Sequence, residues 1–373
     1  MSTLFWLSVI FCVYTYAVYP VLIYLLSRRR AMPQVDTAQI TDWPSVSIVI
    51  AAHNEAENLQ RKLDNLAALD YPGSVETVVV SDGSTDGTVA LLAARDDVLL
   101  VDCAQARGKP SALNAGMQRA TGEIIVFMDA RQTIEQGSLQ ALVKYFSLPE
   151  VGAVSGELVM TDGENHEAAN IGLYWRYEKF IRACESRYFS TAGATGALYA
   201  IRRTDFVPHR PETLLDDFET PVATLRKGKR TLFEPAAVAY DRPSDNVADE
   251  FRRKSRTLAG NYQSFMWNLW LFNPRRNRIW WQFLSHKVFR LLVPYAMVLA
   301  LFSSALADNQ LIKGFFFAQL LFYAAAVAAF TSERVAQNKL ANFIKVFLQM
   351  NYAAVHGLVR YLTGKSSVRW KKT

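Results

Sequence analysis

Three long runs without a charged residue constrain this chain more than any other feature of its sequence. Residues 4–26 are 23 consecutive uncharged residues, and about 20 apolar residues in a helix are enough to span a bilayer. The run lacks the charged n-region and the cleavage site of a secretory signal peptide, which favours a retained anchor. Residues 291–307 and 314–332 are two further runs, joined by a short polar loop, and they predict a helical hairpin through the membrane.

Basic residues next to these runs predict their orientation. Three arginines at 28–30 follow the first run, and five lysines or arginines between 275 and 290 precede the second. The positive-inside rule places both flanks, and the chain between them, in the cytoplasm. Residues 340–362 are apolar but carry ionisable side chains and precede a basic tail, so we interpret them as an amphipathic helix on the cytoplasmic face. We therefore expect a multi-pass protein of the cytoplasmic (inner) membrane.

The formal net charge of +7 does not indicate nucleic-acid binding, because the excess is local. Residues 251–290 hold nine lysines or arginines, four tryptophans and no acidic residue, a composition typical of a membrane interface. The three cysteines have no paired spacing and the five histidines are scattered. A disulfide framework, a zinc site and a histidine metal cluster are therefore not supported.

Short β-branched runs alternate with amphipathic stretches from Val46 onward. Strands are predicted at 46–52, 76–82, 98–102 and 123–129, with helices between them, the first of them beginning after Asn54 as an N-cap. This alternation predicts an α/β fold built on a mostly parallel sheet.

Acidic residues follow the predicted strands. Glu55, Asp82, Asp102 and Asp129 lie at or just beyond the four strand ends, and open parallel sheets bind ligands at that edge. A dinucleotide oxidoreductase is the competing interpretation, but "AAHNEAEN" after the first strand has no glycine, and no phosphate-loop motif is present. The predicted sheet therefore binds a nucleotide in another way.

Five stretches, in this order, resemble a known family: "VSIVIAAHNEAENL", "VVVSDGSTDGT", "RGKPSALNAGM", "GEIIVFMDA" and "TGALYAIRR". They are similar to the family 2 inverting glycosyltransferases, which have the GT-A fold. The layout also resembles the membrane-embedded synthases of cellulose, chitin, hyaluronan and related exopolysaccharides. The resemblance runs from about Val46 to Arg256, and it implies a Rossmann-like, mostly parallel cytoplasmic domain with α-helical transmembrane and interfacial segments.

The implied division of the chain has five parts. They are an N-terminal anchor at 1–30, a GT-A domain at 43–245, interfacial amphipathic helices at 246–287, a transmembrane hairpin at 288–332, and a C-terminal amphipathic helix with a basic tail at 333–373.

The resemblance implies which residues bind the nucleotide-sugar donor. Ala51, His53, Glu55 and Asp82 match positions around the nucleotide, and a carboxylate can accept hydrogen bonds from a base N–H or from ribose hydroxyls. Asp82 followed by glycine also suits an ordinary tight turn. Lys109 precedes a helix whose N-terminus favours phosphate oxygens, although a solvated loop lysine is the alternative.

Asp129 matches the first carboxylate of the family's D-x-D motif, which holds a divalent cation on the donor diphosphate. Arg131 stands where the second carboxylate would be. Magnesium or manganese can be held by one carboxylate together with phosphate oxygens and water, so Asp129 alone can suffice. A guanidinium binds phosphate bidentately. We therefore predict a weakened metal requirement with Arg131 near the diphosphate, unless Arg131 points to solvent.

The resemblance places the catalytic base in "TLLDDFETP", residues 213–221, at Asp217, with Asp216 in the place of the family's glutamate. Inversion requires one carboxylate to take the proton of the attacking acceptor hydroxyl. Two acids that open a helix are otherwise ordinary capping charge. The small residues of 192–203 are expected to line the acceptor side.

Arg253 and Arg256 lie where the synthases carry Q-x-x-R-W, and they are expected to grip the diphosphate. Thr257 replaces the tryptophan that stacks on the acceptor sugar. Contacts with lipid headgroups are an equal alternative for this basic cluster.

These features predict a glycosyltransferase that moves a hexose or N-acetylhexosamine from a nucleotide sugar, expected to be a UDP-sugar. The expected acceptor is a lipid-linked or growing glycan, in exopolysaccharide or cell-surface glycan synthesis. A polyprenyl-phosphate monosaccharide transferase is the first alternative, and a non-catalytic nucleotide-binding subunit of a polysaccharide-secretion complex is the second. Membrane lipids are expected partners, and a homo-oligomer or a secretion complex is left open.

Overall fold

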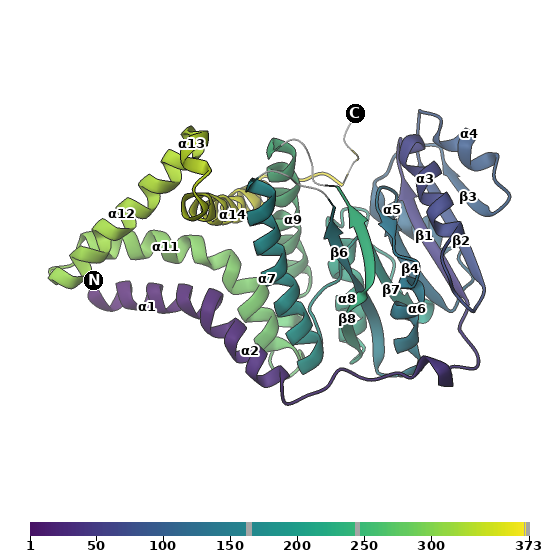
Figure 1. Cartoon of the computed structure of the whole chain (residues 1–373), viewed down its shortest axis with the longest axis horizontal. Helices are drawn as coiled ribbons and strands as arrows, with labels where there is room; N and C mark the ends of the chain where they lie inside the picture. Colours follow the sequence, from purple (N-terminus) through teal and green to yellow (C-terminus); the bar gives the residue numbers. More distant parts are fainter. Residues whose placement is uncertain (162–165, 243–246, 369, 371–373) are drawn as a thin grey trace.

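A computed structural model describes residues 1–161, 166–242, 247–368 and 370 of the chain. Long helices gather at one end of the molecule and a sheet flanked by helices at the other (Figure 1). The expected boundary between residues 245 and 246, and the tail residues Arg369, Lys371 and Lys372, lie outside the described part.

In the described part of the chain, one eight-stranded sheet forms the end of the molecule away from the long apolar helices (Figure 1), in the order β3-β2-β1-β4-β7-β6-β8-β5. The first four strands of the chain are parallel neighbours, while β7 runs antiparallel to β4 and to β6. The strands are β1 Val46–Ala52, β2 Val75–Asp82, β3 Val98–Cys103, β4 Ile124–Asp129, β5 Thr133–Ile134, β6 Val151–Met160, β7 Leu198–Arg202 and β8 Arg230–Asp241. The four predicted strands and the mostly parallel α/β class are confirmed.

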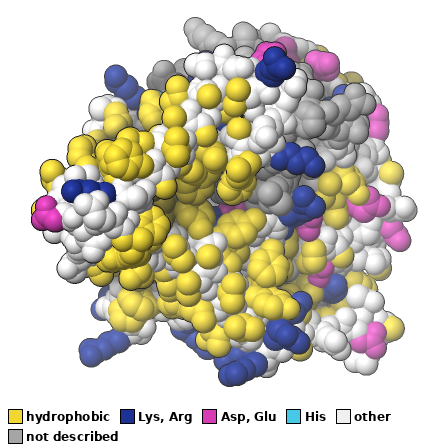
Figure 2. All heavy atoms as spheres, turned by 60° about the vertical axis from the view of Figure 1, so that its left-hand side comes forward, with side chains coloured by type: hydrophobic (Ala, Val, Ile, Leu, Met, Phe, Trp, Pro, Cys, Tyr) yellow, Lys and Arg dark blue, Asp and Glu magenta, His cyan; other side chains and the backbone are white. Residues whose placement is uncertain are grey.

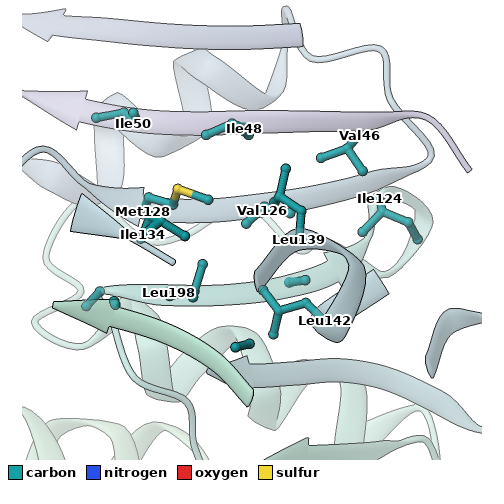
Figure 3. Packing of buried hydrophobic residues seen from close by; sticks show 14 of the residues in the cluster. Val46, Ile48, Ile50, Ile124, Val126, Met128, Ile134, Leu139, Leu142 and Leu198 are labelled. Atoms are coloured by element: carbon teal, nitrogen blue, oxygen red, sulfur yellow. The ribbon is translucent and has the colours of Figure 1, made fainter. Parts of the chain in front are cut away.

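Alternate residues of the central strands form two separate cores. Ile48 and Ile50 of β1 pack with Val126 and Met128 of β4 on one face, beneath Leu139 of α6 (Ser138–Val143) (Figure 3). The intervening residues of the same strands pack on the other face against α5 (Lys109–Met117). Because the strands are covered on both sides, they are apolar throughout, as expected of a parallel sheet.

The helix after β1 begins one residue later than its predicted cap implies. α3 spans Ala56–Ala67, with Glu55 at its N-cap position. Asn54 instead adopts a positive φ of 55°, and its side-chain oxygen accepts a hydrogen bond from Thr85 N–H at 2.8 Å. The prediction of Asn54 as the cap was wrong: in the turn between β1 and α3 Asn54 adopts a left-handed conformation, which asparagine tolerates, and its side chain bonds to the loop after β2.

Among the described residues, three helical stretches are long and apolar enough to cross a membrane: Ser2–Ser27, Trp280–Ala305 and Gln310–Thr331. Their outer side chains face outward; Leu7, Phe302 and Leu321 are 61%, 62% and 72% exposed. Figure 2 shows hydrophobic side chains over this end of the molecule, with a hollow at the centre and lysine and arginine side chains around it. The second stretch begins at Trp280, well before the predicted start at residue 291.

Two helices that follow β8 in the chain, α9 (Val247–Trp267) and α14 (Lys339–Leu362), lie between this end and the sheet (Figure 1). α9 packs against α14, and a Cβ added to Gly357 of α14 would lie 2.9 Å from Leu258 Cβ. Phe218 of α8 (Asp216–Arg226) packs with Phe265 and Phe283 in a cluster between the sheet and the membrane helices. The helix that opens with the two predicted acids is therefore anchored on its membrane side.

Candidate active site

The first part of the candidate site is built around the buried carboxylate of Asp82. This residue ends β2 and is only 1% exposed. Its carboxylate accepts hydrogen bonds from Arg107 N–H at 2.9 Å and from Gly108 N–H at 2.6 Å. Gly108 has a φ of 95°, a conformation that favours glycine. The loop before α5 thus turns two backbone donors toward one buried carboxylate.

His53 contacts Asp82, whereas Ala51 and Glu55, the other two predicted residues in this part of the chain, have different partners. His53 Nδ1 lies 2.7 Å from the backbone oxygen of Asp82. Ala51 is buried on β1 and pairs with Asp129 across the sheet. Glu55 accepts a hydrogen bond from Asn58 at 2.7 Å at the start of α3. Asp102 lies at the same sheet edge but is exposed.

Lys109 connects the two parts of the site. Its Nζ lies 2.8 Å from Asp129 Oδ1 and 3.3 Å from Asp216 Oδ2. Burial alone would lower the pKa of Lys109, but the two carboxylates raise it above its usual value. The ammonium therefore stays charged and holds together an acid from β4 and an acid from α8, which are 87 positions apart in the sequence.

Asp216 and Asp217 are adjacent, yet their environments push their pKa values in opposite directions. Burial would raise the pKa of Asp216, but Lys109 and His209 lower it below its usual value. Burial and the neighbouring charge of Asp216 raise the pKa of Asp217 to about 6. A Cβ added to Gly196 would lie 3.1 Å from Asp217 Oδ2. A carboxylate with such a pKa, open to a glycine loop, suits a general base at neutral pH.

Arg131 is held by a residue that the sequence did not point to. It forms an ion pair with Asp241 at the end of β8, and Gln132 Nε2 donates to the same carboxylate at 2.9 Å. Below them Lys62, 1% exposed, donates to Gln132 O at 2.9 Å. Burial lowers the pKa of Lys62 to about 7, against the opposing effect of Asp129. The role of Arg131 at the diphosphate stays a prediction.

Arg253 and Arg256 lie one turn apart on α9, and Arg256 is the more buried of the two. Gly260, one turn after Arg256, would place a Cβ 2.5 Å from Leu215 Cγ, so this face of α9 packs on the start of α8. The Nε of Arg256 is buried without a hydrogen-bond partner. A buried donor of this kind fits an anionic group that binds there. Arg253, three positions before Arg256 on neighbouring parts of the same helix surface, is exposed.

The side chains present fit a divalent cation that is bound mainly by phosphate oxygens of a nucleotide and by water, with one carboxylate from the protein. Among the described residues, no three His, Cys, Asp or Glu side chains gather as a metal site. Asp129 is 37% exposed at its side chain and offers one carboxylate at the site's edge. One carboxylate completed by phosphate oxygens and water is a normal arrangement for magnesium or manganese.

The structure adds residues that the sequence did not single out: His209 near Asp216, Lys62 and Asp241 around Arg131, and Trp370 against His53 and Asp82. The sequence did contain a hint that Trp370 has a role, because it is an aromatic residue in a mostly polar and basic tail. Nothing in the local sequence pairs Arg131 with Asp241, 110 positions later.

Comparison with known proteins assigns the domain that this site belongs to. The model of glycosyl transferase family 2 matches residues 47–207, which include β1, β2, β4 and Lys109. Residues 47–207 are therefore identified as a family 2 glycosyltransferase domain, and this match covers less than half of the chain. The match ends before Asp217 and α9, so these parts of the site lie outside it.

Two relatives and one solved structure extend the glycosyltransferase comparison. An N-acetylglucosaminyltransferase of Azorhizobium caulinodans is 26% identical over 59% of this chain and 60% of its own length. A poly-β-1,6-N-acetyl-D-glucosamine synthase of Staphylococcus aureus is 22% identical over 63% of this chain and 59% of its own. The chain thus spans about three fifths of these relatives.

A mannosyltransferase of Pyrobaculum calidifontis, solved with GDP-Man and Mn²⁺, shares the fold. It superposes with a TM-score of 0.71 at 24% identity, over 97% of this chain and 99% of the other. The expected GT-A fold is confirmed, and the likeness includes the membrane-side helices because it covers nearly the whole of both chains.

Proposed function

We propose that this protein transfers a sugar, with inversion, from a nucleotide-sugar donor to an acceptor at the membrane surface. The observation that carries the proposal is Lys109 placed between Asp129 and Asp216, beside Asp217. Lys109 thereby connects Asp129, where a diphosphate and its cation would bind, with the acidic pair that contains Asp217, the proposed proton acceptor. The names of the relatives support a glycosyltransferase of hexose or N-acetylhexosamine.

Each group has a role in the proposed reaction. The nucleobase lies at His53 and Asp82. Asp129 would hold the divalent cation, which would supply positive charge to stabilise the leaving diphosphate. Arg256, and Arg131 if it leaves Asp241, bind phosphate oxygens. Asp217 accepts the proton as the acceptor oxygen forms its bond to the anomeric carbon and the diphosphate departs. No covalent intermediate with the protein is required.

The donor is either a UDP-sugar or a GDP-sugar. The sequence led us to expect UDP, whereas the similar structure was solved with GDP-Man. A carboxylate acceptor beside an aromatic ring serves either base, because uracil and guanine both present a ring N–H. Both nucleotides therefore belong in the first assay.

The acceptor is proposed to be a hydroxyl of a glycan linked to an anionic lipid carrier, because a hydroxyl brings the proton that Asp217 accepts. Arg182, on α7 (His166–Tyr188), donates to Thr195 Oγ1 at 2.8 Å, next to the glycine loop that faces Asp217. Lys287, near the start of the second candidate span (Trp280–Ala305), is within electrostatic reach of Arg182 and Asp217. Two cations on the membrane side of the base suit a lipid phosphate or diphosphate. This observation also favours the polyprenyl-phosphate transferase as the second candidate.

The test is release of nucleoside diphosphate by the purified, detergent-solubilised protein from UDP-GlcNAc, UDP-glucose and GDP-mannose. Each donor is tried with polyprenyl phosphate, with a lipid-linked glycan and without acceptor, in Mg²⁺, Mn²⁺ or EDTA. We expect one donor to turn over only when a lipid acceptor is present, and Asp217→Asn to abolish product. Binding without turnover for every donor and acceptor would support the non-catalytic alternative.

A further inference from the structure

The C-terminal tail reaches from the membrane helices to the catalytic half. After α14 ends at Leu362, the chain leaves the helical end and continues toward the sheet (Figure 1). Its backbone contacts the loop before α5, because a Cβ added to Gly108 would lie 2.7 Å from Val368 O. The tail thus touches the same glycine that donates to Asp82.

Trp370 makes the decisive contacts. Its indole lies parallel to the His53 ring, with centroids 5.8 Å apart and an interplanar angle of 11°. Its Nε1 donates a hydrogen bond to Asp82 Oδ2 at 2.6 Å. The side chain also packs on the apolar cluster between the sheet and α5. A flat ring, stacked on an aromatic residue and donating one N–H to a buried carboxylate, is also what a nucleobase would present.

The two occupants exclude each other. Three donors converge on Asp82 Oδ2: the N–H groups of Arg107 and Gly108 and the indole of Trp370. One carboxylate oxygen offers about two acceptor positions, so a base N–H can bind Oδ2 only after the indole N–H has left. The face of His53 that stacks on the indole is likewise covered.

We propose that the tail is an intramolecular competitor of the donor: Trp370 occupies the place of the nucleobase, and the donor binds only when the tail moves away. This rests on the proposed function, which puts the base at Asp82. A tail bound about nine-tenths of the time lowers the apparent donor affinity about tenfold.

Calorimetric binding of UDP and of GDP, with Mn²⁺, to the full chain and its variants tests this. Trp370→Ala and a chain that ends at Gly364 are expected to bind the nucleotide about tenfold more tightly than the wild type. Trp370→Phe retains the stacked ring without the N–H and is expected to fall between them. Lys365→Ala, an exposed tail position away from the pocket, is the matched control and keeps the wild-type affinity.

The direction in which Trp370→Ala changes nucleotide affinity distinguishes a tail that competes with the donor from a tail that covers it. Unchanged or weaker binding by Trp370→Ala overturns the proposal, and weaker binding identifies the tail as a cover over bound donor. Amide hydrogen exchange is an independent measurement. If the tail competes with the donor, added nucleotide must raise exchange in residues 365–373 of the wild type, whereas a tail that covers bound donor would exchange more slowly. Asp82→Ala in the truncated chain tests the underlying function: unchanged nucleotide affinity there means that the base binds elsewhere, whatever Trp370 does.

Discussion

The two ends of the site use carboxylates in opposite ways. Asp82 is surrounded by hydrogen-bond donors, two from the backbone and one from Trp370. Asp217 has a buried acidic neighbour instead, and its pKa is raised to about 6. A carboxylate that is fully provided with donors suits recognition, because its charge is already stabilised. One that is poorly stabilised as an anion suits proton transfer, because it gains by accepting a proton.

The largest effect is expected from Asp217→Asn. Removal of the general base should lower the rate of transfer about a thousandfold while donor affinity changes less than twofold. Steady-state transfer and calorimetric donor binding measure the two quantities. Asp82→Asn is the matched control, with weaker donor binding and a smaller loss of maximal rate. If Asp217→Asn also lost donor binding, the division between a recognising and a reacting carboxylate would be wrong.

Lys109→Met is expected to change the pH dependence of transfer. Asp217 must be ionised to act as a base, so the wild-type rate should fall as the pH drops through about 6. Without the ammonium, the carboxylates of Asp216 and Asp217 ionise less readily, and the acid limb should move to higher pH. Lys109→Arg retains the charge and should keep the limb in place. If the acid limb of the pH–rate profile stayed in place in Lys109→Met, Lys109 would not control the ionisation of the general base.

Arg131→Ala tests whether the arginine serves the donor or only Asp241. If it binds the diphosphate, donor affinity should fall about tenfold and the Mn²⁺ concentration for half-maximal rate should rise. Gln132→Ala removes the other side-chain donor to Asp241 and serves as the control. Equal, small effects of the two variants would assign Arg131 a structural role.

The smallest effect expected is on stability, with opposite signs at neighbouring positions. A raised pKa means that Asp217 favours folding at low pH and opposes it once the pH rises through about 6. Asp217→Asn should therefore raise the melting temperature at pH 8 by a few degrees, from about 1–2 kcal/mol, by less at pH 5, and not below the ordinary aspartate pKa of 3.8. Asp216→Asn loses its ion pair with Lys109 and should lower it at pH 8. Thermal unfolding followed by tryptophan fluorescence compares the two.

The sequence by itself determined the parts of this protein that depend on local pattern. Uncharged runs gave the three apolar helices and β-branched runs gave the four parallel strands, because hydrophobic burial and backbone geometry act over a few neighbouring residues. The parallel direction of these strands also determined that His53, Asp82 and Asp129 meet at one edge.

Only the tertiary structure decided which distant groups meet and what their charges become. Lys109 between Asp129 and Asp216, Arg131 on Asp241, and Trp370 on Asp82 each join residues 20 to 288 positions apart. Contacts of this kind depend on strand order and on the path of the tail. The divided pKa values of Asp216 and Asp217 follow for the same reason, since burial and neighbouring charges exist only once the chain has folded.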